Sequence, residues 1–570
     1  MEKRIALLTV LSLGVLIGWM FLSNRLWPTP KPRPKAVVYD EPAWTEVRKA
    51  AVAPPPVVEA PQEPRESIVL EGRTVRATLT NRGAGLRVLE LKFRDGWMPL
   101  LSTDTSGEAS APHLVLSVAG EPDLDSAFWR VKEETPTRVA FSRRLQSGLE
   151  LERVYAVDDR GALAVTISMT NSGGAEQKIQ AELRAFHGMA HDSEYRRDQY
   201  ARGFVVKKRG QGYELVSTPL GDVEKKPVRH AGSGLEKGQV YDSVGLANRF
   251  FAVALLTESD GTREALDAAV FAKHGKAPTA HVNASLAWHE ISVRDKRSLE
   301  YTLFAGPLDD HVLAETGRGL PDLHTYGGGC IWPITALVPA IAWILLKLMG
   351  FWAWVTGNWG VAIILTTLCL RLCLFPLSRK STVSMAKMGE LGPKMTLIRE
   401  RYADDPRKAQ AETMKLWKEH GVSPLSGCLP IFLQLPIWIS MYSVVDMAIE
   451  FRQAPFMLWI RDLSQPDQLA HLPFALPLIG SAFNLLPLIM TVTWFLQAYY
   501  APRSPDPQMA MQQKMFLFMP IVFGLMCYSL ASALSLYFFM NSLLSMAEQK
   551  IIKRIWLPPK PPDAPGGKPA

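Results

Sequence analysis

An arginine inside an apolar run is the feature that most constrains what this chain can fold into. Residues 361–377 are almost wholly apolar, yet Arg371 lies among them, and Arg379 and Lys380 follow just beyond. A guanidinium keeps its proton, so surrounding it with hydrocarbon costs between about 2.5 and more than 10 kcal/mol unless water or a partner solvates it. Arg371 precedes Arg379 by eight positions, roughly 12 Å of helix, which places it between the headgroup boundary and the bilayer midplane.

Two interpretations of Arg371 remain open from its depth alone. The side chain can snorkel to the interface, or it can face a water-filled groove. Thr367 precedes it by four residues and adds a hydroxyl to the same helical face, which favours the groove. Asp446 and Glu450 are expected near the outer end of their helix, so no carboxylate partner is expected at the depth of Arg371. The expected lack of a carboxylate at this depth also argues against a proton-driven transporter, which normally needs a carboxylate near the midplane.

The 570 residues divide into two unlike parts. Mean hydropathy is close to zero, because a polar, strand-rich segment precedes a series of apolar runs of spanning length. The net charge of +8 is modest, and the basic residues cluster beside apolar runs, which favours a membrane surface over nucleic acid. The expected domains are an N-terminal membrane anchor (1–27), a proline-rich linker (28–66), a β-supersandwich (67–320), an interfacial helix (321–357), a five-span core (358–550) and a basic, proline-rich tail (551–570).

The first large segment is predicted to be an antiparallel β-sandwich outside the cytoplasm. Short β-branched runs at 75–80, 86–91, 163–169, 250–256 and 299–304 alternate with Gly- and Asn-containing turns. An enzyme of the mutarotase kind is an alternative, with His187, His191, Asp192 and Glu194 as its candidate cluster. Their spacing matches no catalytic or metal site, so the preferred interpretation is that they are polar residues on the protein surface with no role in a site. Cys369 and Cys373 also lack the further ligands of a metal site, and no cofactor is expected.

The second part is predicted to cross the membrane five times, at 359–377, 425–448, 485–500, 515–530 and 531–549. The N-terminal apolar stretch is interpreted as an uncleaved membrane anchor. It adds a sixth crossing, and an even number of crossings leaves both termini in the cytoplasm. The segment 379–418 holds ten basic residues, whereas the outer connection 450–477 holds two, as the positive-inside rule requires. Residues 331–350 are read as interfacial because Pro333, Pro339 and Lys347 interrupt them and tryptophans recur along them.

The inner segment 379–420 is predicted to form a cytoplasmic helical hairpin split at Asp404-Asp405-Pro406. Its first arm carries Met385, Met388, Met395 and Tyr402 at helical spacing. Methionine adapts to apolar partners of different shape, which suits a surface that meets many sequences; packing alone is the simpler explanation.

The chain resembles the YidC-type membrane protein insertases of Gram-negative bacteria. The residues that carry the resemblance occur in family order: 357–360 (GNWG), Arg371 with 375–377 (FPL), 384–388 (SMAKM), 424–430 (PLSGCLP), 434–436 (QLP), 452–456 (RQAPF) with 458–460 (LWI), 511–514 (MQQK), 518–520 (FMP) and 536–537 (LY). The soluble part is similar to the family's periplasmic β-supersandwich, more weakly, through 81–85 (NRGAG) and 303–307 (LFAGP).

The resemblance implies a groove open to cytoplasm and lipid but sealed from the periplasm. Arg371, Thr367 and Gln434 are its expected polar residues. The expected contacts for a client's apolar segment are Pro430, Phe518, Met519, Pro520, Tyr537 and Phe538. Relatives can carry two tyrosines where this chain has Tyr537 followed by Phe538, so a polar role at position 538 is in doubt.

The function expected from these features is insertion and folding of other membrane proteins in the inner membrane, without catalysis or ATP. No Gly-x-x-x-x-Gly-Lys-Ser/Thr loop is present. The expected partners are nascent membrane proteins and membrane lipids, with the Sec translocase, the ribosome or a targeting receptor as further candidates and no nucleic-acid substrate. A small-molecule or lipid transporter is the alternative, although no paired internal repeats are detectable. A membrane-tethered carbohydrate-active enzyme is the third candidate.

Overall fold

The structure is a computed structural model that forms two compact units, Met1–His324 and Thr325–Ala570. It describes residues 64–65, 67–102, 112–118, 121, 123–158, 162–179, 181–189, 201–209, 212–219, 228–230, 240–258, 266–273, 279–286, 289–323, 334–402, 405–421, 429–476, 480–500 and 507–556. The predicted anchor, most of the proline-rich linker, residues 557–570 of the predicted C-terminal tail, and His191, Asp192 and Glu194 lie outside these residues, as does the side chain of His187. Residues 551–556, predicted to begin the tail, instead continue the last helix.

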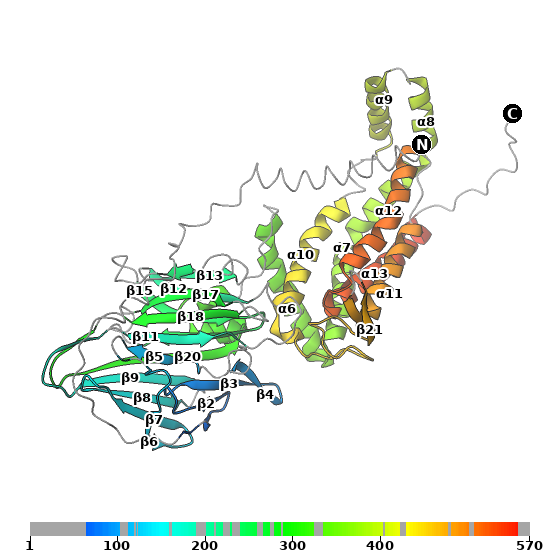
Figure 1. The fold of residues 1–570 in the computed structure, drawn as a ribbon. Coiled ribbons are helices and arrows are strands. Elements are labelled where there is room, and N and C mark those ends of the chain that lie inside the picture. The colour runs from blue at the N-terminus through cyan, green and yellow to red at the C-terminus, as the bar shows by residue number, and fades with distance from the viewer. Residues whose placement is uncertain are drawn as a thin grey trace. The chain divides into compact units, whose positions relative to one another are not determined.

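The first unit is built from antiparallel strands (Figure 1). They are β1 (Ile68–Glu71), β2 (Val75–Leu79), β3 (Leu86–Phe93), β4 (Gly96–Ser102), β5 (Val115–Val118), β6 (Arg130–Glu134), β7 (Arg138–Arg144), β8 (Leu149–Val157), β9 (Leu163–Asn171), β10 (Gln177–Ile179), β11 (Ala181–His187), β12 (Arg202–Arg209), β13 (Gly212–Pro219), β14 (Val228–His230), β15 (Val240–Ala247), β16 (Phe251–Thr257), β17 (Leu266–Lys273), β18 (Thr279–Leu286), β19 (His289–Ile291) and β20 (Lys296–Pro307). The five runs predicted from the sequence are confirmed as β2, β3, β9, β16 and β20.

These strands form layered sheets, as predicted. A nine-stranded sheet has the order β13-β12-β15-β16-β20-β9-β8-β7-β6, and a five-stranded sheet has the order β14-β17-β18-β11-β5. The five-stranded sheet packs over β12 and β15, while β1 of the four-stranded sheet β1-β2-β3-β4 lies against β8. Strand β9 alternates buried and half-buried residues along most of its length, so one face supplies the core and the other faces outward.

The turn between β2 and β3 is fixed by contacts from β8. Gly83 has φ +63°, and an added Cβ would lie 2.4 Å from the carbonyl oxygen of Asp125, so this position requires glycine. The wholly buried Tyr155 donates its hydroxyl to the Ala84 carbonyl at 2.8 Å, and Arg153 Nη1 donates to the Gly83 carbonyl at 3.4 Å. Burial lowers the pKa of Arg153. These contacts give a structural reason for the NRGAG run.

The second unit is helical. Its helices are α6 (Ile334–Thr356), α7 (Trp359–Glu390), α8 (Gly392–Arg401), α9 (Pro406–Glu419), α10 (Leu429–Met447), α11 (Leu485–Tyr499), α12 (Pro507–Met526) and α13 (Ser532–Trp556), and a short ribbon of β21 (Ala470–Leu476) and β22 (Gly480–Phe483) precedes α11. In the first unit, α5 (Asp310–Thr316) and η4 (Leu320–Leu323) follow β20. Helices α6, α7, α10, α11 and α13 share one apolar core.

By length and composition, two described helices can cross a membrane, the segment Leu337–Thr356 of α6 and Trp359–Glu390 of α7. The first of these was predicted to be interfacial. Val338, Ala342, Leu345 and Met349 pack into the helical core, while the opposite face remains apolar, with Trp354 82 % exposed. Shorter apolar helices fall at Leu485–Tyr499 and Leu517–Met526, inside two of the predicted spans.

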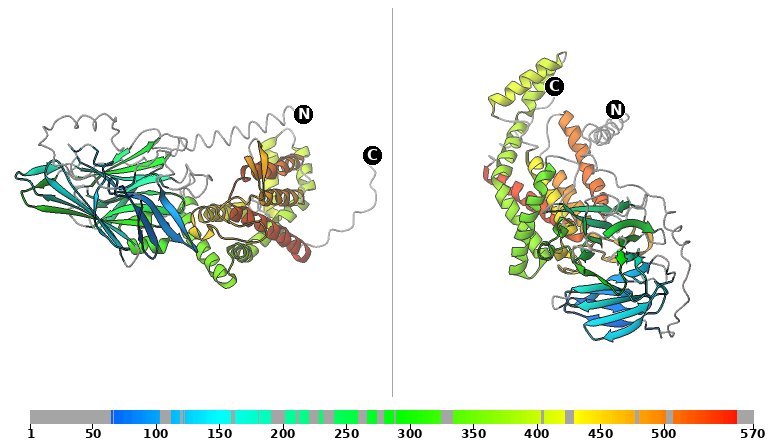
Figure 2. Two further views of the ribbon diagram at one scale, coloured as in Figure 1. Left: turned by 60° about the horizontal axis from the view of Figure 1, so that its bottom comes forward. Right: turned by 90° about the vertical axis from the view of Figure 1, so that its left-hand side faces the viewer.

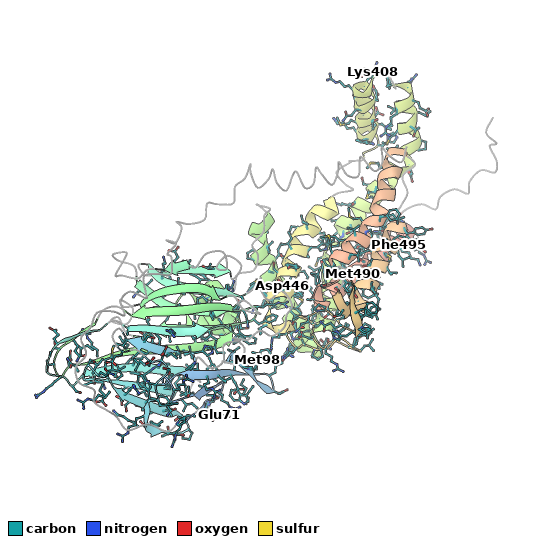
Figure 3. The ribbon with its side chains drawn as sticks, in the orientation of Figure 1. Glu71, Met98, Lys408, Asp446, Met490 and Phe495 are labelled. Carbon is teal, nitrogen blue, oxygen red and sulfur yellow. The ribbon has the colours of Figure 1, made fainter. Side chains whose placement is uncertain are left out.

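Helices α8 and α9 lie side by side as a hairpin, which Figure 1 shows clearly and Figure 2 shows from two further sides. Helix α8 ends at Arg401 and α9 begins at Pro406, the last residue of the predicted break, while Asp404 lies outside the described residues. The first arm differs from the prediction, because α7 continues to Glu390 before a break at Leu391 begins α8. In Figure 3, Lys408 marks the hairpin, and Asp446 lies at the end of α10 away from it.

Candidate functional site

Arg371 of α7 is held against α13 by three hydrogen bonds. Its Nε donates to Asn541 Oδ1 at 3.0 Å, its Nη2 to the Asn541 carbonyl at 3.1 Å, and its Nη1 to Glu548 Oε2 at 3.4 Å. The side chain is 17 % exposed and that of Glu548 is 9 % exposed. The guanidinium is therefore solvated mainly by the protein, through an amide, a helix carbonyl and a carboxylate.

Glu548 corrects the expectation that Arg371 lacks a carboxylate partner. Asp446 was rightly placed at the far end of α10, but Glu548 was overlooked because it lies next to the end of the predicted last span, 531–549. Helix α13 continues beyond that end to Trp556. Glu548 is therefore within a helix that packs along α7, and its carboxylate reaches back toward Arg371.

One face of α13 is polar and buried. Tyr537, Asn541, Ser545 and Glu548 are each less than a tenth exposed. Their spacing of four, four and three residues places them on one side of a helix. That periodicity is the sequence signal that would have found Glu548. Ser545 Oγ accepts a hydrogen bond from Gln497 of α11 at 3.2 Å, so the polar face also reaches a second helix.

Gln434 and Thr367, the other two predicted polar residues, differ in their contacts. Gln434 of α10 donates from Nε2 to the Tyr537 hydroxyl at 3.0 Å. Thr367 is buried, and its hydroxyl donates to the Ile363 carbonyl of its own helix at 2.7 Å. The structure therefore joins Gln434 to the α13 face, whereas the Thr367 proton is used within α7.

The predicted apolar contact residues separate into exposed and buried groups. Phe518 and Met519 on α12 are 63 % and 45 % exposed, and Pro520 is half-buried. Tyr537 and Phe538 belong to the helical core instead, where the Phe538 ring lies 5.4 Å from the Trp494 ring, centroid to centroid. Both rings are buried in this structure, and their contact with a client stays a prediction. The Pro430 side chain lies outside the described part.

The hairpin residues also differ in exposure. Met385 is 45 % exposed and Met388 is half-buried, while Met395 of α8 is buried. Tyr402 ends α8, and the Lys408 ammonium lies 5.2 Å from the centroid of its ring. Met385 thus presents an apolar surface, whereas Met395 serves the packing of the hairpin.

Polar side chains are also buried in the segment between α10 and α11. Asp467 Oδ2 accepts hydrogen bonds from Trp459 Nε1 and from the backbone N–H groups of Leu485 and Leu486, each at 2.9 Å. Arg452 is 1 % exposed. Asp467 thus uses one carboxylate oxygen for these three contacts, and no group of three or more metal-ligating side chains occurs among the described residues.

Comparisons with known proteins cover both units. The sequence family described as 60Kd inner membrane protein matches residues 351–558, and the family described as YidC periplasmic domain matches residues 67–339. The Membrane protein insertase YidC of Paraburkholderia phymatum is 35 % identical over 425 residues, which is 73 % of this chain and 69 % of that protein.

The YidC insertase of Cupriavidus necator is 42 % identical over 253 residues, 44 % of this chain and 41 % of its own length. The alignment with this relative thus spans about two fifths of that protein. A crystal structure of an active YidC insertase is 19 % identical, with a TM-score of 0.34, over 87 % of this chain and 94 % of that one. The alignment with the P. phymatum protein runs through most of both sequences, and the chain therefore belongs to the YidC family of membrane protein insertases.

Proposed function

We propose that this protein inserts membrane proteins into the bacterial inner membrane through a polar path beside Arg371. The observation that carries the proposal is the Arg371 contact with Asn541 and Glu548 on the buried polar face of α13, in a chain of the insertase family. An arginine among apolar helices is costly to keep, and such residues commonly mark a transport or binding path.

The proposed topology has six spans with both termini in the cytoplasm. Helices α7, α10, α11, α12 and α13 supply five, and the apolar segment near the N-terminus supplies the sixth. The α8–α9 hairpin then lies in the cytoplasm, as the basic residues of 379–418 favour. Helix α6 is proposed to lie at the outer interface: the tryptophans on its exposed face, such as Trp343 and Trp354, suit a headgroup region.

The proposed mechanism shortens the distance that a hydrophilic tail travels through hydrocarbon. A polar groove beside Arg371, with Thr367 and Gln434 among its residues, opens to the cytoplasm and lipid. Polar groups that find partners there avoid part of the desolvation cost of the bilayer core. Burial of the client's apolar segment, worth roughly 25 cal/mol per Å², then drives release into lipid. The chemistry requires no covalent step and no ATP.

The proposed client contacts are the exposed side chains of α12, Phe518 and Met519, together with Pro520 and Pro430. Tyr537 and Phe538 become accessible only if α10 and α13 separate. Met385, on the last turns of α7 before the hairpin, is proposed to meet nascent chains or the ribosome first. The Sec translocase, a targeting receptor and membrane lipids are further proposed partners.

The test is insertion of a single-span client with an acidic tail into vesicles that contain the purified full-length protein. Arg371→Ala is expected to slow insertion more than Arg371→Lys, because lysine keeps the positive charge but loses the planar fork. Arg379→Ala is the matched control, since Arg379 is on the same helix but stacks on Trp556. Equal protection of the tail from protease with native protein and all variants would reject the role of Arg371.

A further inference from the structure

Glu548 occupies the acceptor position that an acidic client would need. Arg371 Nη1 donates to Glu548 Oε2, and the other two guanidinium contacts go to Asn541. A client carboxylate that approaches Arg371 therefore meets a guanidinium whose charge is already balanced. It also meets a second negative charge a few ångströms away.

The contact between Arg371 and Glu548 is not a tight one. Its 3.4 Å length exceeds the roughly 2.7–2.9 Å that is usual for a charge-assisted N–H to carboxylate bond. One carboxylate oxygen takes part, so the bidentate geometry that matches arginine to carboxylate is not formed. Arg371 and Glu548 therefore form an ion pair, but a client carboxylate that binds the guanidinium through both oxygens would form a stronger one.

The second oxygen of Glu548 is an independent sign of an unfilled site. Glu548 Oε1 is buried and has no hydrogen-bond partner in the part of the chain that the structure describes. A buried carboxylate oxygen without a donor is costly, and native proteins rarely keep one unless it has a function. Here it lies beside the arginine on which the proposed insertion depends.

We propose that Glu548 is a specificity-determining residue that competes with acidic client segments for Arg371. The inference rests on the proposed insertase function. It adds that the protein discriminates between client tails according to their negative charge. Neutral polar tails, which can take donors from Asn541 and Gln434, pass without displacing an ion pair. Acidic tails must first displace Glu548 from Arg371, so tails with fewer carboxylates are favoured.

The test compares the native protein with Glu548→Gln and Glu548→Asp in vesicles. Two clients differ only in whether one tail position is Asp or Asn, and the measurement is the ratio of their insertion rates. Glu548→Gln is expected to raise the Asp-to-Asn ratio on the order of tenfold, because one of two carboxylates that compete for one guanidinium is removed. The Asn client provides the reference rate in each variant, so a general loss of activity cancels.

Glu548→Asp is the matched control, because it keeps the charge while shortening the side chain. A ratio close to that of the native protein is expected for this variant. An unchanged ratio in Glu548→Gln, or an equal rise in both variants, would overturn the proposal and make the pair purely structural.

A second measurement separates this inference from the function on which it rests. Binding of a fluorescent peptide with an Asp or Asn tail to the detergent-purified protein reports on competition for Arg371 without any insertion. Glu548→Gln is expected to strengthen binding of the Asp peptide relative to the Asn peptide, and Arg371→Gln is expected to remove the difference. If the native protein protects neither tail above empty vesicles, the insertase function is rejected, and the peptide ratio alone decides the role of Glu548.

Discussion

Gly360, in the first turn of α7, lies where a side chain has no room. An added Cβ would lie 2.0 Å from Cδ2 of Phe456. Phe456 cannot easily move away, because its ring packs against the helical core and its carbonyl accepts a hydrogen bond from Asn358 Nδ2 at 2.9 Å. The glycine of the GNWG run therefore permits close approach between α7 and the loop after α10.

Gly360→Ala is expected to destabilise the protein by about 1–3 kcal/mol, the usual range for overpacking a filled core. The control is Gly389→Ala on the same helix, where an added Cβ meets nothing within 4 Å and alanine is favoured over glycine by roughly 0.5–1 kcal/mol. Thermal unfolding in detergent should show a lower Tm for the first variant and an equal or higher Tm for the second. Equal Tm values would show that Phe456 yields without cost.

The site residues illustrate what could be predicted and what could not. Arg371 stood out because one charge in an apolar run is a local signal, readable without knowledge of the fold. Its partners lie 170 and 177 positions away, and only the packing of α7 along α13 brings them together. Burial of Phe538 likewise depends on which face of α13 meets Trp438 and Trp494, and composition does not contain that information.

At the scale of elements, α11 begins with a cap supplied from a distant part of the sequence. Asn484 occupies the N-cap position, but its side chain does not bond to the helix; it donates to the Tyr528 carbonyl at 2.9 Å instead. The first N–H groups of α11 are satisfied by Asp467, which precedes the helix by 18 positions. A carboxylate there also suits the positive end of the helix dipole.

Asp467→Ala is expected to cost about 1–3 kcal/mol, because two helix N–H groups and the Trp459 indole lose their acceptor. Asp467→Asn keeps one oxygen acceptor and should fall between alanine and the native residue. Hydrogen exchange at residues 485–488, followed by mass spectrometry, should become faster in the alanine variant. Unchanged exchange there would mean that water replaces the carboxylate without loss.

The predicted elements were most accurate in their interiors and least accurate at their ends. Strand positions followed from short β-branched runs bounded by turn-forming residues, as for β2 and β9, and five helices fall at the predicted spans. Helix α7 continues past residue 377 to Glu390 because leaving an apolar environment does not break helical hydrogen bonds. Helix α7 ends at Glu390, and Leu391 separates it from α8, which begins with Gly392 and Pro393. Proline is tolerated in the first turn of a helix but not in its interior, so the new helix starts there.

For the whole molecule, the division into two units has a physical basis. The β unit has its own core, in which Phe204, Ala252 and Leu256 pack with Leu313 of α5 and Leu320 of η4. The helical unit has another core, in which α7, α10 and α13 meet. Each core consists of residues from its own unit, so neither unit needs the other to fill its interior.

Replacing residues 67–320 with a short flexible linker is therefore expected to leave the helical unit folded and insertion largely retained. The proposed path consists of residues of α7, α10 and α13, all within the second unit. Insertion of the acidic-tailed client into vesicles is the measurement, and circular dichroism with thermal unfolding in detergent verifies that the remaining helices are intact. Arg371→Ala in the shortened protein provides the matched control, because it should lower insertion there as it does in the full chain. If insertion stops while the helices stay folded, the β unit takes part directly, and the path beside Arg371 is not sufficient for activity.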